Sequence, residues 1–156
     1  MRLRPISLGF LLLLGGCDAI YGIQSRLALP APVDVGCVHA ALLAIPEAGP
    51  VSYERDEARS TEILPKQRKV LTVMHVWLYG GGAILQMNET PDGWEFSNGR
   101  TRMGVEVPRE ELLRFVPLMQ EANRSLQARC GLPVADLQAE PVGETKRDWR
   151  RSATGR

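Results

Sequence analysis

The chain has few of the residues that usually carry catalytic or metal-binding chemistry. Its 156 residues include two histidines and three cysteines, and its formal net charge at pH 7 is +1. It has no Gly-x-Ser-x-Gly or His-Glu-x-x-His motif, and no Lys-Ser/Thr pair follows the three glycines at 80–82. The small net charge gives no electrostatic reason to expect nucleic-acid binding. We therefore expect a protein that is not an enzyme and needs neither a cofactor nor a metal ion.

The first eighteen residues have the layout of a secretion signal. Arg2 and Arg4 precede the apolar run Ile6–Leu14, which is too short to cross a bilayer as a helix. The run ends in Leu14-Gly15-Gly16-Cys17, where two glycines let the backbone enter a narrow peptidase cleft. This start resembles the lipobox signal peptide of bacterial lipoproteins. The resemblance covers residues 1–18 only, and it implies cleavage before Cys17, a diacylglycerol on its thiol and an acyl group such as palmitate on the freed amine.

Acylation at Cys17 implies a place at the membrane. Each buried methylene contributes about 0.8 kcal/mol, so two or three acyl chains hold a protein on a bilayer. We therefore expect the mature chain to be lipid-anchored to the cell membrane and to face the periplasm. Asp18 resembles the residue that keeps enteric lipoproteins in the inner membrane, but other bacteria use later positions, so inner and outer membrane both stay open. The alternative is an ordinary signal peptide with an incidental cysteine.

Composition divides the chain into four parts. These are a signal peptide at 1–16, the lipidated cysteine and a tether at 17–33, a single α+β domain at 34–141, and a basic flexible tail at 142–156. The tether is predicted from its glycine and prolines and from its lack of sustained periodicity; fully extended, it reaches up to about 50 Å. Trp149 interrupts the basic run of the tail, which either solubilises the protein or contacts anionic lipid headgroups.

Cys37 and Cys130 are the two cysteines that remain after cleavage. An even pair in an oxidising, exported compartment is most simply a disulfide. Both residues fall on predicted helices, so the expected bond links one helix to the other. Two separate buried thiols are the alternative, and a metal site lacks a third ligand at a useful spacing.

Turn signals separate the remaining elements. Helices are predicted at 35–45 and 108–130, the second kinked or split at Pro117. Strands are predicted at 51–55, 70–79, 83–89, 94–97 and 100–107, with a charged loop at 56–69. Asn98-Gly99 is expected to form a hairpin turn that pairs Trp94 with Met103. The pattern predicts an α+β fold, an antiparallel β-meander of four or five strands flanked by an N-terminal helix and a longer C-terminal helix.

Alternation along the predicted strands sorts their side chains into two faces. The more apolar face is expected to be the core beneath both helices, and it comprises Leu71, Val73, His75, Trp77, Tyr79, Leu85, Met87, Trp94, Phe96, Met103, Val105 and Val107. We interpret His75 as a core histidine because its neighbours on this face are apolar. His39 is expected at the exposed edge of the first helix.

The opposite face of the sheet is the candidate interaction site. Its apolar residues are Thr72, Met74, Val76, Leu78 and Ile84, and its polar residues are Gln86, Asn88, Glu95, Ser97, Arg102 and Glu106. If both helices lie on the first face, the apolar residues face water, and contiguous exposed apolar surface usually marks a binding site. Alternatively, residues 51–53, the tether, or a helix on each side of the sheet would cover them.

Two functions fit these observations. The first is a non-catalytic envelope lipoprotein that binds an envelope protein, or a second copy of itself, through its sheet. The second is a small ligand-binding or hydrolytic domain with a pocket between sheet and helices. Its pocket would lie near Trp77, Tyr79 and Trp94, and the acidic residues of one hairpin, Glu89, Asp92 and Glu95, would be its candidate carboxylates, although they are more typical of solvated turns. A flat apolar patch favours the first function and a concave polar pocket the second.

Overall fold

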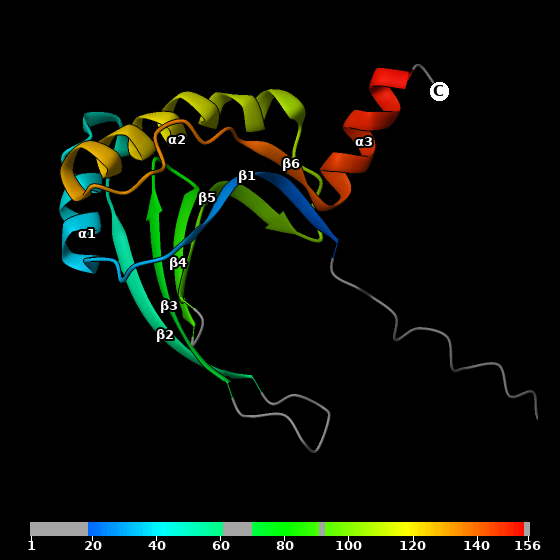
Figure 1. Ribbon diagram of the computed structural model, residues 1–156. Helices are drawn as coiled ribbons and strands as arrows, with labels where there is room; N and C mark the ends of the chain where they lie inside the picture. Colours follow the sequence, from blue (N-terminus) through cyan, green and yellow to red (C-terminus); the bar gives the residue numbers. More distant parts are fainter. Residues whose placement is uncertain (1–18, 61–69, 91–92, 155–156) are drawn as a thin grey trace, which may run out of the picture.

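The computed structural model describes residues 19–60, 70–90 and 93–154, apart from the side chains of 58–60, 70–72 and 154. In chain order the elements are β1 (Ile20–Leu29), α1 (Val35–Leu43), the short 3-10 helix η1 (Pro46–Ala48), β2 (Ser52–Ser60), β3 (Val70–Tyr79), β4 (Ala83–Thr90), β5 (Gly93–Met103), α2 (Arg109–Cys130), β6 (Glu140–Val142) and α3 (Gly143–Thr154). The strands form one antiparallel sheet in the order β2-β3-β4-β5-β1-β6 (Figure 1). The predicted α+β class is confirmed, with more strands than expected.

The central meander has the predicted register. The glycine turn between β3 and β4 pairs Trp77 with Leu85, and the next turn pairs Glu89 with Trp94. The first turn has a steric reason, because Gly80 and Gly81 have positive φ angles of 58° and 73° that side chains disfavour. Alternation therefore predicts correctly which residues of these strands share a face.

The predicted hairpin at Asn98-Gly99 is wrong. β5 continues through both residues to Met103, and β1 pairs with it along its length, with Ser25 opposite Asn98. Position 99 requires glycine because the backbone of β1 passes close to it, not because the chain turns there. A Cβ atom on residue 99 would lie 2.5 Å from the carbonyl oxygen of Ile23. The dipeptide is a strong turn signal only where no other strand is available to pair with it.

The predicted tether at 17–33 is also wrong over most of its length. Ile20–Leu29 is β1, which lies between β5 and β6 in the sheet. Every second residue of this strand turns toward the helices, and Ile23 and Leu29 are buried there. This alternation of period two stabilises a strand because one face can be buried.

The predicted flexible tail at 142–156 corresponds largely to a helix. α3 begins at Gly143, and Trp149 packs against a cluster formed by Ile23, Val107, Leu112 and Met119. The guanidinium carbon of Arg109 lies 4.6 Å from the centre of the Trp149 ring, a cation–π geometry. The aromatic residue therefore attaches α3 to the domain.

Both α1 and α2 cover the same face of the sheet. Buried residues of α1 (Val38, Ala41, Leu42) and of α2 (Ala122, Leu126) pack with Trp77, Leu85, Met87 and Phe96 in one cluster. Fully burying a large apolar side chain contributes about 1.5–3 kcal/mol, so this contact supplies most of the stability. α1 is capped by Asp34, whose Oδ1 accepts a hydrogen bond from the Cys37 amide at 3.0 Å.

The disulfide between Cys37 and Cys130 is confirmed and joins α1 to the end of α2. The cysteines are 93 residues apart, and closing a loop of this length stabilises a fold by about 4–5 kcal/mol in the chain-entropy model. α2 is continuous from Arg109 through Pro117, so its first turn is not split off. It ends at Gly131 in the left-handed conformation, with φ of 68°.

The predicted core face is largely correct. Its members on β3 and β4 from Val73 onward are buried, as are Phe96 and Val107, while the side chain of Leu71 lies outside the described residues. Met103 and Val105 are wrong, since their exposed fractions are 65% and 53%. The predicted hairpin places Met103 on the core face, but β5 continues straight through Asn98-Gly99, so Met103 lies on the same face as Glu95 and Ser97, opposite the helices, and Val105 lies beyond the end of the strand.

A buried polar network connects α2 to the sheet. Tyr79 donates a hydrogen bond of 2.6 Å from its hydroxyl to Asn98 Oδ1, and Asn98 Nδ2 donates to Asn123 Oδ1 at 2.9 Å and to the Met119 carbonyl at 3.2 Å. Burial raises the pKa of Tyr79, so the hydroxyl keeps the proton that it donates. Asn98 is completely buried, and its position in this network explains its place in mid-strand.

The network predicts a large effect of Asn98→Ala. This substitution leaves the Tyr79 hydroxyl and the Asn123 amide oxygen buried without the partner they have now, which costs about 3 kcal/mol of unfolding free energy. Urea denaturation measures the loss. Asn88→Ala is the matched control, because Asn88 is half-buried and its side chain accepts a hydrogen bond from Gln86 near the surface of the sheet; its expected cost is below about 1 kcal/mol. Equal effects of the two substitutions would contradict the role assigned to Asn98.

Candidate interaction surface

The face of the sheet opposite α1 and α2 is called the open face here. The register places its residues in three rows from β2 to β1, which are Ser52, Leu78, Ile84, Gly99 and Gln24; Glu54, Val76, Gln86, Ser97 and Arg26; and Asp56, Met74, Asn88, Glu95 and Ala28. Within the described residues, both long helices pack on the other side. Figure 1 shows α1 and α2 together beside the sheet.

The centre of the open face is apolar. Met74, Val76 and Leu78 of β3 and Ile84 of β4 lie side by side, and we call these four residues the apolar stripe. Leu78 is 44% exposed and the other three are half-buried. Thr72 belongs to the same face of β3 by register, but its side chain lies outside the described residues. The structure thus brings the predicted apolar residues together on a face that no described helix covers.

Charged residues flank the apolar stripe on both sides. Glu54 and Asp56 of β2 are exposed opposite Val76 and Met74, and Arg26 of β1 is exposed on the other side. Between them, the amide side chains of β4 are linked, since Gln86 Nε2 donates to Asn88 Oδ1 at 2.7 Å. The open face is therefore apolar in the middle, acidic toward β2 and basic at one point toward β1.

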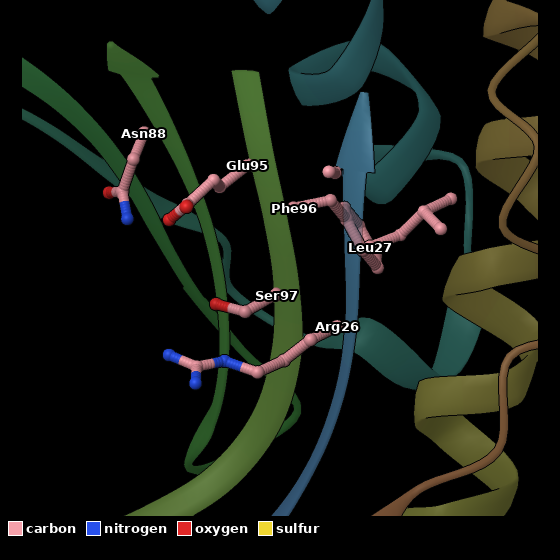
Figure 2. Close-up of a pocket in the computed structure, with 7 residues that line it drawn as sticks. Arg26, Leu27, Asn88, Glu95, Phe96 and Ser97 are labelled. Carbon is pink, nitrogen blue, oxygen red and sulfur yellow. The ribbon is translucent and has the colours of Figure 1, made fainter. Parts of the chain in front are cut away.

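A polar hollow adjoins the apolar stripe on the side of β1. It has a volume of about 270 Å³ and is lined by Arg26, Leu27, Ala28, Asn88, Glu95, Phe96 and Ser97. Figure 2 shows the side chains of Arg26, Glu95 and Ser97 extending to the same side of their strands, with Leu27 directed to the other side. In the part of the chain that the structure describes, neither Arg26 nor Glu95 forms an ion pair. The hollow thus offers one cation and one anion to a binding partner.

The two edges of the sheet are poorly suited to pairing with another strand. β2 carries alternating charges, and Arg55 pairs with Glu57 at 2.7 Å. β6 has three residues, one of which is Pro141. Charge and proline on short edge strands prevent strand addition. A partner that binds the sheet is therefore expected on the open face rather than along an edge.

Aromatic rings surround His75 on the helix side of the sheet. Its ring is nearly parallel to those of Tyr53 and Trp94, with centroid distances of 6.2 and 5.6 Å, and Nδ1 lies 2.9 Å from the Tyr53 hydroxyl. His75 is 5% exposed, which agrees with the predicted core position. Burial lowers the pKa of His75, and the nearby Arg55 lowers it further, against a raising effect of Glu89. The imidazole is therefore neutral near pH 7.

Three buried nitrogen atoms near this ring stack have no protein partner in the described chain. They are His75 Nε2, Trp77 Nε1 and His39 Nδ1. The sequence predicts an exposed His39, but its side chain is half-buried. Its ring lies 6.1 Å from the ring of Tyr53. Buried nitrogens without partners are uncommon and are often bonded to water. On the helix side of the sheet, these three nitrogen atoms are the groups most able to bind a polar ligand.

Glu89 and Glu95, the two candidate carboxylates that the structure describes, lie on opposite faces of the sheet. Glu89 lies opposite Trp94 on the helix side, whereas Glu95 lies opposite Asn88 on the open face. Asp92 lies outside the described residues, as does Cys17. Among the residues described, no group of three or more histidine, cysteine or acidic side chains is placed to hold a metal ion, and no helix there is long and apolar enough to span a bilayer.

The polar hollow was not predicted from the sequence. Three of its seven lining residues come from β1, a segment whose composition predicts a tether. A signal was present, since Tyr21, Ile23, Leu27 and Leu29 fall at alternate positions of the segment 20–29. Because Ser25 interrupts this series and Gly22 lies within it, the alternation is weak.

No protein-family model, curated protein or solved structure matches the chain. The function proposed below therefore starts from the residues of the open face and from the resemblance of residues 1–18 to a lipobox signal peptide.

The lowered pKa of His75 predicts a loss of stability in mild acid. The folded state keeps the imidazole neutral, while the unfolded state takes up a proton below about pH 6.5. The unfolding free energy therefore falls as pH decreases through 6.5 toward the lowered value. Urea denaturation between neutral pH and mild acid measures this slope, and His75→Gln should remove much of it. A slope that depends on His39→Gln instead would contradict the assignment to His75.

Proposed function

We propose that this chain is an envelope lipoprotein, anchored at Cys17 and facing the periplasm, that binds a protein partner through the open face of its sheet. The apolar stripe carries this proposal. Four neighbouring apolar side chains lie on a face without a described helix, and Leu78 is 44% exposed. Contiguous apolar surface with a polar border is typical of protein interfaces.

Charge complementarity specifies the kind of partner. The open face has Glu54 and Asp56 on one side of the apolar stripe and Arg26 on the other. A fitting protein has an apolar centre, basic groups that meet β2, and an acidic group that enters the polar hollow beside Arg26. Opposite charges across an interface set its orientation and exclude wrong partners. Inner or outer membrane placement is left open by this proposal.

The alternative, a ligand-binding or hydrolytic domain with its pocket between sheet and helices, has less support. Trp77 and Tyr79 are completely buried in the packed core, and Glu89 and Glu95 lie on opposite faces. Its remaining support is the unpartnered Nε2 of His75 beside Trp94. A non-catalytic binding protein therefore fits the described residues better.

The anchor predicts a defined covalent form in the host cell. The mature protein should begin at Cys17 and carry fatty acids there, and Cys17→Ser should abolish both cleavage and acylation. Intact-mass measurement of protein extracted from envelopes tests this directly. A chain that still begins at Met1 without fatty acid would contradict the anchor.

The open face predicts site-specific crosslinking in living cells. A photoreactive amino acid in place of Leu78 should yield a discrete adduct with an envelope protein. The same group in place of Leu43 should yield none, because Leu43 is exposed on α1, on the other side of the sheet. Val76→Asp should abolish the Leu78 adduct, since it buries a charge against the partner.

Two further variants separate binding from folding and identify the partner type. Arg26→Glu should lower the adduct yield about tenfold by charge reversal at the hollow, whereas Leu43→Asp should leave it unchanged. All variants should retain the thermal unfolding midpoint of the unmodified chain. Equal adducts from both probe positions would contradict the proposed surface, and an adduct with a second copy of this chain would replace the envelope protein as partner.

A further inference from the structure

The distance between the proposed lipid anchor and the domain is much shorter than a tether would allow. Only Asp18 and Ala19 separate Cys17 from β1. Three residue steps span at most about 10 Å. The Ala19 carbonyl also accepts a hydrogen bond of 2.7 Å from the Gly104 amide, which ties residue 19 to the end of β5. If Cys17 is acylated as proposed above, the start of β1 lies at the bilayer surface.

Exposed apolar side chains gather at this end of the molecule. Ile20 lies opposite Met103, and Val105 follows two residues later. Their exposed fractions are 46%, 65% and 53%. We call these three residues the end patch. It is separate from the apolar stripe, because Met103 lies four residues along β5 from Gly99, the partner of Ile84, and Ile20 lies on β1, two strands from β4.

Basic charge lies beside the end patch. α3 starts next to Ile20, since Tyr21 forms a bridge with Gly143, and a Cβ atom on Gly143 would meet the backbone of Ile20. The helix carries four basic and two acidic residues, and its four basic side chains are exposed. Figure 1 shows the start of β1, the end of β5 and α3 at one end of the molecule, with α1 at the other.

We propose that the end patch and α3 dock on the surface of the anionic bilayer that holds the lipid anchor. This proposal rests on the acylation of Cys17. Three arguments select a lipid surface as the occupant: the short chain to the anchor, the exposed apolar side chains at that same end, and the net positive charge of the adjacent helix. Basic residues are attracted to an anionic membrane surface, and apolar side chains insert at the headgroup boundary.

Docking at this end gives the open face a defined position. Arg26 lies six residues along β1 from Ile20, and a strand rises about 3.3 Å per residue, so the polar hollow stands about 20 Å from the end patch. The apolar stripe then remains accessible to a partner while the domain is held on the membrane. A long tether would leave both height and orientation undefined.

Oxidative footprinting of the acylated full-length protein tests the docking. The protein is purified from envelopes, reconstituted in vesicles of phosphatidylcholine with a minor share of phosphatidylglycerol, exposed to hydroxyl radicals and analysed by mass spectrometry. Met103 and Met74 have the same intrinsic chemistry, so their rates report their environments. In the free domain Met103 oxidises faster, because it is 65% exposed and Met74 is half-buried. On vesicles we expect the order to reverse, with Met103 as slow as the buried Met87.

A charged variant provides the matched test of the end patch. Val105→Asp should restore fast oxidation of Met103 on vesicles, whereas Leu43→Asp, at an equally exposed position of α1, should not. Both positions are on the surface, so both variants are expected to fold. On vesicles of phosphatidylcholine alone, faster oxidation of Met103 would support an electrostatic contribution of α3 to docking. Unchanged protection of Met103 would overturn that contribution and leave docking through the apolar end patch.

The mass of the N-terminal peptide separates the two proposals. Fatty acid on Cys17 together with rapid oxidation of Met103 on vesicles overturns the docking and leaves the lipoprotein assignment intact. Absence of fatty acid on protein from envelopes overturns both, because the short connection to a bilayer is then lost.

Discussion

The pairing of β1 with β5 is the interaction on which the rest of this structure depends. Ten residue pairs join the two strands, from Ile20 with Met103 to Leu29 with Trp94. The pairing extends β5 beyond Asn98, and it brings that side chain beneath α2, where it bonds to Tyr79 and Asn123. It also provides the strand with which β6 pairs and against which α3 packs. Without β1, the meander would have an unpaired edge at β5.

The two faces of the sheet differ because the helices and their disulfide lie on one side. α1 and α2 bury the large side chains of that face, and the Cys37–Cys130 bond joins the ends of the two helices. The open face is left with a mixture that is less apolar than a core and less polar than an ordinary surface. Charges along β2 protect the edge but also border the apolar stripe. A protein surface that binds reversibly needs this intermediate composition, because a fully apolar face would aggregate.

The central half of the fold could be predicted from the sequence, and the ends could not. The strands from Val70 to Thr90 alternate clearly and are separated by glycine turns, so their register and the apolar stripe follow from a period of two. The pairing of β1 joins residues 65 to 83 positions apart, and no local pattern encodes it. Asn98-Gly99 was mistaken for a turn because its local propensity is strong, whereas a distant strand and a buried network determine its conformation. Trp149 was assigned to a tail because its apolar contacts also come from distant segments.

The same strand relates the proposed anchor to the proposed binding surface. β1 begins three residues after Cys17, and it carries Arg26 into the polar hollow. An extended strand within a sheet transmits position far more rigidly than a flexible linker of equal length, because β1 is paired with β5 along all ten residues and with β6 at Gly22–Gln24. A partner on the open face would therefore be held at a fixed height above the membrane. Replacing β1 by a true tether would remove both the hollow and that fixed height, so anchoring and binding depend on one element of the fold.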